Sequence, residues 1–226
     1  LEFRRVLFRS GVFGSVQGMT IGLGIIRNKL VAVLIGPAGV GIISLFNSAI
    51  TLLTNTANMG LGVSGVRNVS EAYEAYDARR MATVVDMLRF CTLLTGLVGM
   101  ALCLLLSMVL SKATFSDDEH MVDFMLLSPV VALSCITVGE TAILKGARML
   151  RRLAQLTIVG LVVTILITIP LYYFYRERAI VPSLLVAAVV QTCATVLCSY
   201  RAFPLRLNWD MRHVRSGRSE EHTSEL

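Results

Sequence analysis

Long uncharged stretches divide the chain and predict membrane-spanning helices. Phe90–Ser111, Leu153–Tyr175 and Ala179–Tyr200 contain no charged residue, and Phe124–Leu144 contains only Glu140. Each is long enough as a helix to cross about 30 Å of hydrocarbon, which takes about 20 residues. The pattern therefore predicts an all-α, polytopic membrane protein with six spans. We place the spans at about 12–35, 39–63, 86–111, 121–144, 154–175 and 179–200.

Glycine and proline mark the predicted breaks. Gly36-Pro37-Ala38-Gly39 is expected to form the turn between the first two spans, because proline and paired glycines interrupt helices. The segment Gly60–Gly65 matches GxGxxG, but the nucleotide-binding version follows a strand, whereas an uncharged helix precedes it here. We interpret these glycines as the end or bend of the second span. The charged stretch Ser70–Asp86 that follows predicts a short helix outside the membrane.

Charge is too scarce for a soluble domain. Charged residues make up 16% of the chain, against roughly a quarter in soluble domains. A nucleic-acid-binding protein could share the net charge of +6, but here the charges fall in short clusters between uncharged runs. That arrangement is typical of membrane proteins and argues against a nucleic-acid partner.

Lysine and arginine gather in alternate loops. One set of loops, with Arg89 just inside the third span, holds twelve of these residues, whereas the other set holds only Lys112, Arg176 and Arg178. Because cytoplasmic loops carry the excess of positive charge, the first set is predicted to lie in the cytoplasm. With an even number of spans, both ends of the fragment then lie in the cytoplasm of a bacterial inner membrane. The twelve are Arg67, Arg79, Arg80, Arg89, Lys145, Arg148, Arg151, Arg152, Arg201, Arg206, Arg212 and Arg215.

The two ends of the chain are related through the opposite DNA strand. Codons that encode RSEEHTSEL, residues 218–226, read on the opposite strand as EFRRVLFRS, the sequence of residues 2–10. We therefore expect 1–10 and 218–226 to be translated sequencing-adapter sequence rather than protein. The natural protein is then expected to continue past Gly217.

No cofactor, metal or catalytic site is predicted. The cysteines lie in apolar runs without a CxxC pair, which is typical of small buried residues rather than zinc ligands or disulfides. The acidic segment Ser116–Glu119 is interpreted as a capping box that opens the fourth span. No nucleophile stands beside a base in sequence, which argues weakly for transport over catalysis.

The second predicted span carries a polar face. Unsatisfied amides in lipid cost several kcal/mol each, so this face must meet other helices or water. Ordinary hydrogen bonding between helices and a water-filled cavity both satisfy that requirement. The residues follow helical spacing, and they are Asn47, Thr51, Thr54, Asn55 and Asn58.

Three charged residues interrupt the otherwise uncharged runs. Arg27 and Lys29 interrupt the first span, and a helix that runs to Ile35 places Arg27 about 12 Å from its outer end. A cation there either reaches the interface or faces a cavity, where an arginine suits a pyrophosphate through paired hydrogen bonds. Glu140 is the one acid within these runs. It pairs with a cation, titrates as a coupling site, or lies at the interface.

Three segments resemble a known family. They are Ile25–Ser48, Gly60–Ala72 (GLGVSGVRNVSEA) and Leu144–Ala154 (LKGARMLRRLA). They are similar to the N-terminal half of O-antigen and related polysaccharide flippases. The superfamily of these flippases also includes multidrug-extrusion antiporters and the peptidoglycan lipid flippase. The similarity covers essentially all of residues 11–205.

The resemblance implies two six-helix lobes around a cationic cavity. Residues 11–205 would form the first lobe, and 206–217 a cytoplasmic connection to a missing second lobe. Such proteins move undecaprenyl-diphosphate-linked oligosaccharide, as in lipopolysaccharide synthesis, across the inner membrane by alternating access driven by an ion gradient. The implied partners are this substrate, membrane lipids and the second lobe.

Individual positions inherit roles from the resemblance. Arg27 and Lys29 are expected to engage the diphosphate, and Arg67 to lie at the cytoplasmic mouth. Two alternatives stay open, a drug or cation antiporter of the same fold and a membrane enzyme of polysaccharide assembly. The expected sugar path is the polar face of the second span, with Asn47, Thr51, Asn55 and Asn58.

Overall fold

Helices make up all the regular structure that is described. The computed structural model describes residues 2–75, 78–115 and 121–203. The predicted capping box at 116–119, the connection 206–217 and the adapter segment 218–226 lie outside the described residues. The elements are α1 (Glu2–Asn58), α2 (Leu61–Glu74), α3 (Ala78–Phe115), α4 (Met121–Gly146), α5 (Leu150–Tyr175), the 3-10 turn η1 (Arg176–Ala179) and α6 (Ile180–Ala202).

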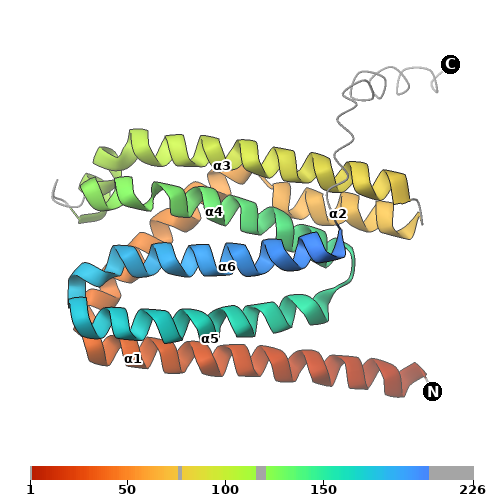
Figure 1. Ribbon diagram of the computed structural model, residues 1–226, viewed down its shortest axis with the longest axis horizontal. Coiled ribbons are helices and arrows are strands. Elements are labelled where there is room, and N and C mark those ends of the chain that lie inside the picture. Colours follow the sequence, from red (N-terminus) through yellow and green to blue (C-terminus); the bar gives the residue numbers. More distant parts are fainter. Residues whose placement is uncertain (1, 76–77, 116–120, 204–226) are drawn as a thin grey trace.

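A kink at Gly36 divides α1 into two limbs. Gly36 has φ 81° and ψ 173°, a conformation that essentially only glycine adopts without strain. Pro37 begins the second limb, where its missing N–H leaves no hydrogen bond unmade. The predicted break between the first two spans is therefore confirmed, but it is a kink at Gly36 alone rather than a turn over 36–39. Figure 1 shows the limbs diverging from the kink, the first along α5 and the second behind the bundle.

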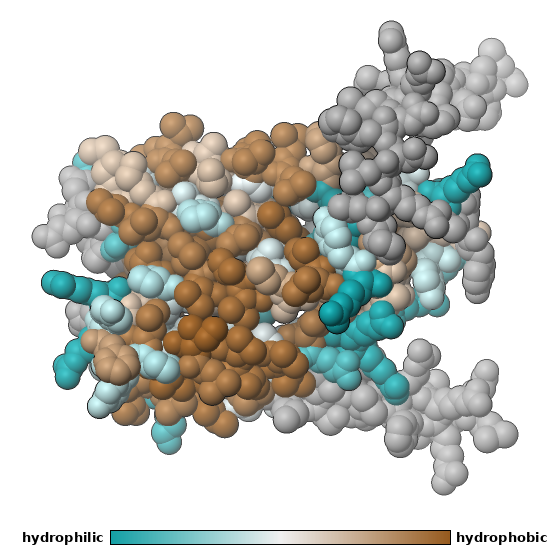
Figure 2. Space-filling model, in the orientation of Figure 1, coloured by the Kyte–Doolittle hydropathy of each residue, from teal (hydrophilic) through white to brown (hydrophobic). Residues whose placement is uncertain are grey.

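The helices meet the length and composition that a membrane requires. Among the described residues, five helices are long and apolar enough to cross a bilayer, with 20–58 of α1 counted as one. Because Gly36 divides that helix, the six predicted spans correspond to the two limbs of α1 and to α3, α4, α5 and α6. The predicted all-α, polytopic class is confirmed. Figure 2 shows an apolar band between hydrophilic ends.

The segment after the second span differs from the prediction. The helix α1 ends at Asn58 rather than near residue 63, and Met59 (φ 43°) and Gly60 (φ 84°) break the chain before α2 begins. The short helix expected within 70–86 instead covers 61–74, and α3 starts eight residues before the predicted boundary at 86. The interpretation of the glycines as a helix end is confirmed.

Apolar residues within the charged segment explain this difference. Val69 of α2 and Val85 of α3 are almost completely buried, and they pack with Ile143 of α4 in one cluster. The apolar residues of α2 and of the start of α3 follow helical spacing. Each of these two short stretches can therefore bury one face, while most of its charged residues stay exposed. Charge alone therefore predicts the end of the second helix and the start of the third helix several residues too late, near 63 and 86 rather than at Asn58 and Ala78.

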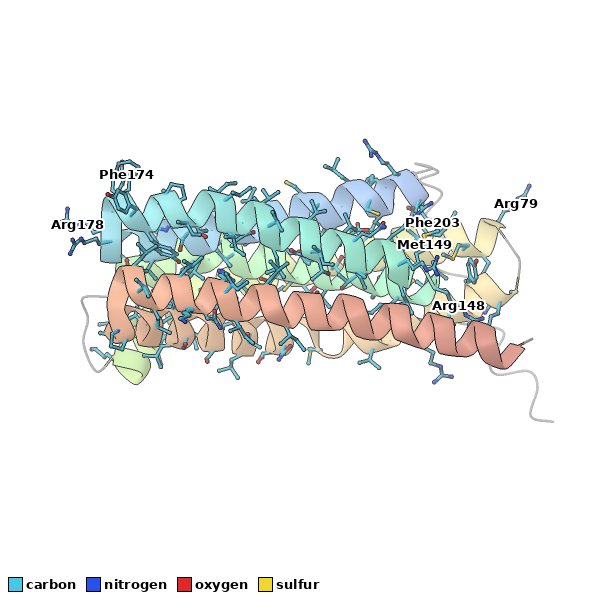
Figure 3. All side chains as sticks on the ribbon, turned by 90° about the horizontal axis from the view of Figure 1, so that it is seen from below. Arg79, Arg148, Met149, Phe174, Arg178 and Phe203 are labelled. Carbon is cyan, nitrogen blue, oxygen red and sulfur yellow. The ribbon has the colours of Figure 1, made fainter. Side chains whose placement is uncertain are left out.

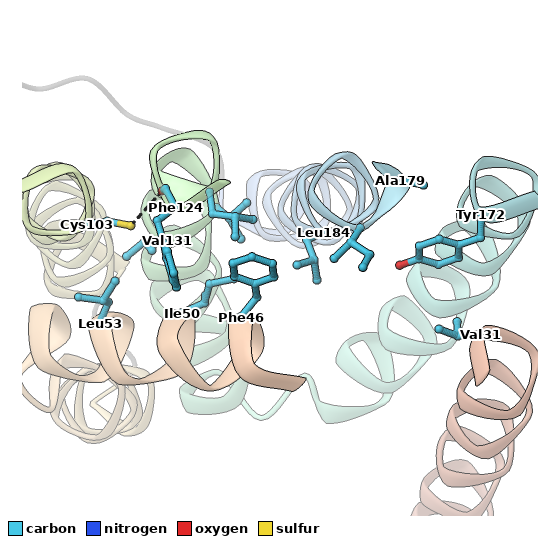
Figure 4. Close-up of a cluster of buried hydrophobic side chains, with 13 residues drawn as sticks. Val31, Phe46, Ile50, Leu53, Cys103, Phe124, Val131, Tyr172, Ala179 and Leu184 are labelled. Carbon is cyan, nitrogen blue, oxygen red and sulfur yellow. Dashed lines mark hydrogen bonds between the residues drawn. The ribbon is translucent and has the colours of Figure 1, made fainter. Parts of the chain in front are cut away.

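The main core joins both limbs of α1 to the other spans. The rings of Phe46 in α1 and Phe124 in α4 pack edge to face, with centroids 5.2 Å apart. Tyr172 of α5 forms a hydrogen bond with Ser183 of α6, which satisfies the phenol inside the core. Figure 4 shows these aromatic side chains with Val131 and the other apolar residues of the cluster.

The two sets of loops lie at opposite ends of the bundle. Arg79 and Arg148 lie at one end, and Phe174 and Arg178 at the other (Figure 3). We call the first the basic end; it comprises α2, the start of α3, the end of α4, the start of α5 and the end of α6 (Figure 1). The kink at Gly36 lies at the opposite end. The loops that were predicted to share one side of the membrane therefore share one end of the fold.

The kink supplies a first prediction. Gly36→Ala should destabilise the fold by about 1–3 kcal/mol, because alanine is strained at this φ and ψ. Gly41→Ala is the matched control, since Gly41 is helical and a Cβ there would meet nothing within 4 Å. Thermal unfolding in detergent, followed with a dye that reacts with buried Cys103 and Cys135, measures both variants. Equal midpoints for the two would contradict this account of the kink.

Candidate functional site

Arg27 lies on the first limb of α1, within the stretch 20–58 that is long and apolar enough to cross a membrane. It is nine residues before the kink, which corresponds to about 13 Å along a helix. Its side chain is half-buried and that of Lys29 is exposed, and neither has a polar partner among the side chains that the structure describes. The neighbouring Ile25 and Ile26 are exposed as well, as expected for a surface that lipid or another helix covers.

The predicted polar face of the second limb is divided in two. Asn47, Thr51 and Asn55 are exposed, whereas Thr54 and Asn58 are buried. The exposed three line a shallow hollow of about 430 Å³ together with Ser48 and Leu52. The expected single face is thus an outward-facing row backed by two buried residues.

The exposed hydroxyls on this limb have hydrogen-bond partners in their own helix, whereas the exposed amides do not. Ser48 donates to the carbonyl of Ser44 at 2.9 Å, and Thr51 donates to the carbonyl of Asn47 at 2.7 Å, so their own helix satisfies them. The side-chain amides of Asn47 and Asn55 have no hydrogen bond within the described part of the chain. The two amides, rather than these two exposed hydroxyls, therefore require water, a ligand or another helix.

The buried pair faces α3. The hydroxyl of Thr95 in α3 donates to Oδ1 of Asn58 at 3.1 Å. The Nδ2 group of Asn58 and the hydroxyl of Thr54 are buried without a partner in the described residues. Asn58 therefore joins α1 to α3 and lies behind the exposed row.

A buried ion pair joins α3 to α4 at the basic end. Nε of Arg89 in α3 donates to Oε1 of Glu140 in α4 at 3.0 Å. Arg89 is 6% exposed and Glu140 is 3% exposed. An isolated charge at such a depth is very costly, so each residue depends on the other.

Arg89 also binds the end of α6. Its Nη2 donates to the hydroxyl of Ser199 at 3.2 Å, and its Nη1 donates to the carbonyl of Phe203, which follows the last turn of α6, also at 3.2 Å. The guanidinium carbon lies 3.9 Å from the centre of the Tyr200 ring, a cation–π contact. One side chain thus joins the end of α6 to α3.

The sequence predicts three alternative roles for Glu140 and does not predict its pairing with Arg89. Arg89 is predicted just inside the third span and is counted with the loop charges, but it lies eleven residues inside α3 and is buried. Of the three alternatives for Glu140, the structure contains the pairing with a cation. The available signal was that Arg89 and Glu140 both lie near the basic ends of neighbouring spans.

Arg67 lies apart from Arg27. It is on α2 at the basic end, whereas Arg27 lies on the half of the first limb nearer to the kink. Its Nε donates to Glu71 at 2.8 Å, and this hydrogen bond and the charge of Glu71 raise the pKa of Arg67 above its ordinary value. The structure therefore does not bring the predicted cations together. Arg67 borders a second hollow, between α2 and α4.

The fold and the distribution of polar groups define a multi-pass helical membrane protein with ionisable and amide groups inside its spans. A model of the family described as "Polysaccharide biosynthesis protein" matches residues 9–219. Because this match covers most of the chain, the chain belongs to that family, whose members are generally transporters rather than enzymes. No curated protein and no solved structure matches the chain.

The buried pair supplies a second prediction. Glu140→Gln should destabilise the fold by about 3–5 kcal/mol, because it leaves the Arg89 charge buried and unpaired. Glu74→Gln is the matched control: its partner Arg148 and Glu74 itself are both more than half exposed, so the cost should stay below about 1 kcal/mol.

Thermal unfolding in detergent compares the two variants directly. A double change of Arg89 and Glu140 to leucine should recover most of the loss, since buried ion pairs are often replaceable by apolar residues. If Glu140→Gln unfolded at the same temperature as Glu74→Gln, the pair would not have the structural role assigned to it.

Proposed function

We propose that this chain forms the N-terminal lobe of a transporter that flips a lipid-linked oligosaccharide, an O-antigen or related polysaccharide unit, across the bacterial inner membrane. Membership of the family supports a role in polysaccharide biosynthesis. One observation carries the step to transport. Asn47 and Asn55 hold unsatisfied amides on an exposed row of a membrane-spanning limb, which suits a water-filled path for a hydrophilic sugar.

Arg27 and Lys29 are proposed to engage the diphosphate. A diphosphate ester needs cations at the depth of the path, and Arg27 has no partner of its own among the described side chains. Its planar guanidinium can grip two phosphate oxygens at once, which the point charge of Lys29 cannot. The isoprenoid tail would remain in lipid, against the exposed isoleucines of the same limb.

The remaining predicted positions follow the same path. Thr51 and Asn55 would contact the sugar, and Arg67 would meet the substrate at the basic end, which we assign to the cytoplasm from its excess of lysine and arginine. A second lobe would cover the exposed row. Alternating access would then open the path to each side in turn.

Glu140 is proposed to couple this movement to an ion gradient. Its carboxylate is held by Arg89, and Arg89 also binds the last turn of α6. Binding of the coupling ion at Glu140 would weaken its hold on the guanidinium and so loosen the end of α6. The structural role of the pair and this coupling role use the same contact.

A third prediction tests the proposed function. In the natural full-length protein reconstituted into liposomes, Arg27→Ala should slow the flipping of fluorescent undecaprenyl-diphosphate oligosaccharide roughly tenfold or more, because charge-assisted hydrogen bonds are lost. Arg178→Ala, an exposed cation at the end remote from α2, is the control and should keep the original rate.

The same assay separates the alternatives. Lipid movement at an unchanged rate in Arg27→Ala would refute the assigned role of this arginine. Export of cationic drugs without any movement of the lipid would instead identify an antiporter of the same superfamily.

A further inference from the structure

The hollow between α2 and α4 has a volume of about 710 Å³ and lies at the basic end. Its walls come from two helices that approach closely, since a Cβ at Gly62 of α2 would lie 3.0 Å from Val138 of α4. The lining residues are Gly62, Val63, Val66, Arg67, Ser70, Glu71, Val138, Thr141, Ala142 and Lys145.

The lining has an apolar part and a charged part in sequence order. On α2 the valines Val63 and Val66 precede Arg67, and on α4 Val138 precedes Lys145 by two helical turns. Both helices therefore change from apolar to cationic along the hollow. This order matches a site at a membrane interface, with apolar walls in hydrocarbon and cations at the level of the phosphates.

The two cations have binding capacity to spare. Arg67 uses its Nε for Glu71, but its two Nη groups have no partner in the described residues. The ammonium of Lys145 has none there either. With one acid and two cations, the rim carries a net charge of +1, and its two cations project from different helices. An arginine and a lysine at one rim are chemically suited to a group with several phosphate oxygens.

We propose that this hollow binds the diphosphate of a polyprenyl-linked lipid while the lipid is still in the leaflet at the basic end. The inference rests on the proposed function and adds a loading site to it. The diphosphate lies between Arg67 and Lys145, and the first isoprenoid units lie along the valines. Arg27 lies nearer to the opposite end. The substrate would therefore bind first between Arg67 and Lys145 and later at Arg27.

A diphosphate fits this rim better than the headgroup of a resident phospholipid. It carries two negative charges and can contact both cations at once, whereas phosphatidylglycerol carries one. The valines next to Arg67 suit a chain attached directly to the phosphates, as in a polyprenyl diphosphate.

Binding of undecaprenyl diphosphate tests the proposal. The full-length protein in phosphatidylcholine nanodiscs is titrated with undecaprenyl diphosphate and, in a parallel arm, with phosphatidylglycerol. Arg67→Ala and Lys145→Ala should each weaken diphosphate binding about tenfold, the effect of losing one charge-assisted hydrogen bond. Val63→Trp, which fills the apolar part from an exposed position, should weaken it without a change of charge.

Arg152→Ala is the matched control. Arg152 is an exposed cation at the same end, outside the hollow and with no carboxylate partner among the described residues, so its loss should leave the affinity unchanged. Because Arg67 and Lys145 are also exposed, their variants should unfold at the original temperature.

Three results would overturn the proposal. They are an unchanged affinity in Lys145→Ala, an equal loss in Arg152→Ala, and phosphatidylglycerol binding that is as tight and as dependent on Lys145. In each case flipping by the unaltered protein would leave the proposed function intact. Conversely, if diphosphate binding depended on Lys145 but the protein moved no lipid, the result would support the binding site in the hollow and refute the transport function.

Discussion

Hydrocarbon offers no hydrogen-bond partner, and this constraint decides how each part of the chain folds. Backbone groups are satisfied within helices, which accounts for the absence of strands among the described residues. Most hydroxyls in the spans donate to a carbonyl of their own helix, as Thr51 does. Some polar groups cannot be satisfied in this way. Among them are Arg89 and Glu140, which satisfy each other, and several groups that no described residue satisfies, namely Arg27, Lys29, the amides of Asn47 and Asn55, the hydroxyl of Thr54 and Nδ2 of Asn58.

These groups distinguish two parts of the molecule. In one part the polar side chains bind each other, and in the other they need a hydrogen-bond partner from outside the described residues. At the basic end, Arg89 joins α3, α4 and the end of α6 with its charge fully compensated. Along the second limb of α1 the amides face outward from an apolar bundle. A second lobe with water between the two would satisfy them, and the same water would admit a sugar.

Much of the fold could be predicted from the sequence because charge and hydropathy act locally. The spans and the break at Gly36 follow from residues adjacent in sequence. The extent of α2 and the start of α3 could not be predicted, because Val69 and Val85 are held by packing with residues far along the chain. The pairing of Arg89 with Glu140 spans 51 positions, and the division of the polar face depends on where α3 crosses α1 at Asn58.

The most direct test is whether water reaches the amide row. In the full-length protein, with its natural cysteines replaced, Asn47→Cys and Asn55→Cys are labelled in intact membranes with a hydrophilic thiol reagent. Thiols react as thiolates, which form in water and not in hydrocarbon. Leu105→Cys, at an exposed apolar position of α3, is the lipid-facing control. The account predicts rapid labelling at 47 and 55 and almost none at 105. Labelling at 47 and 55 as slow as at 105 would contradict a water-filled path.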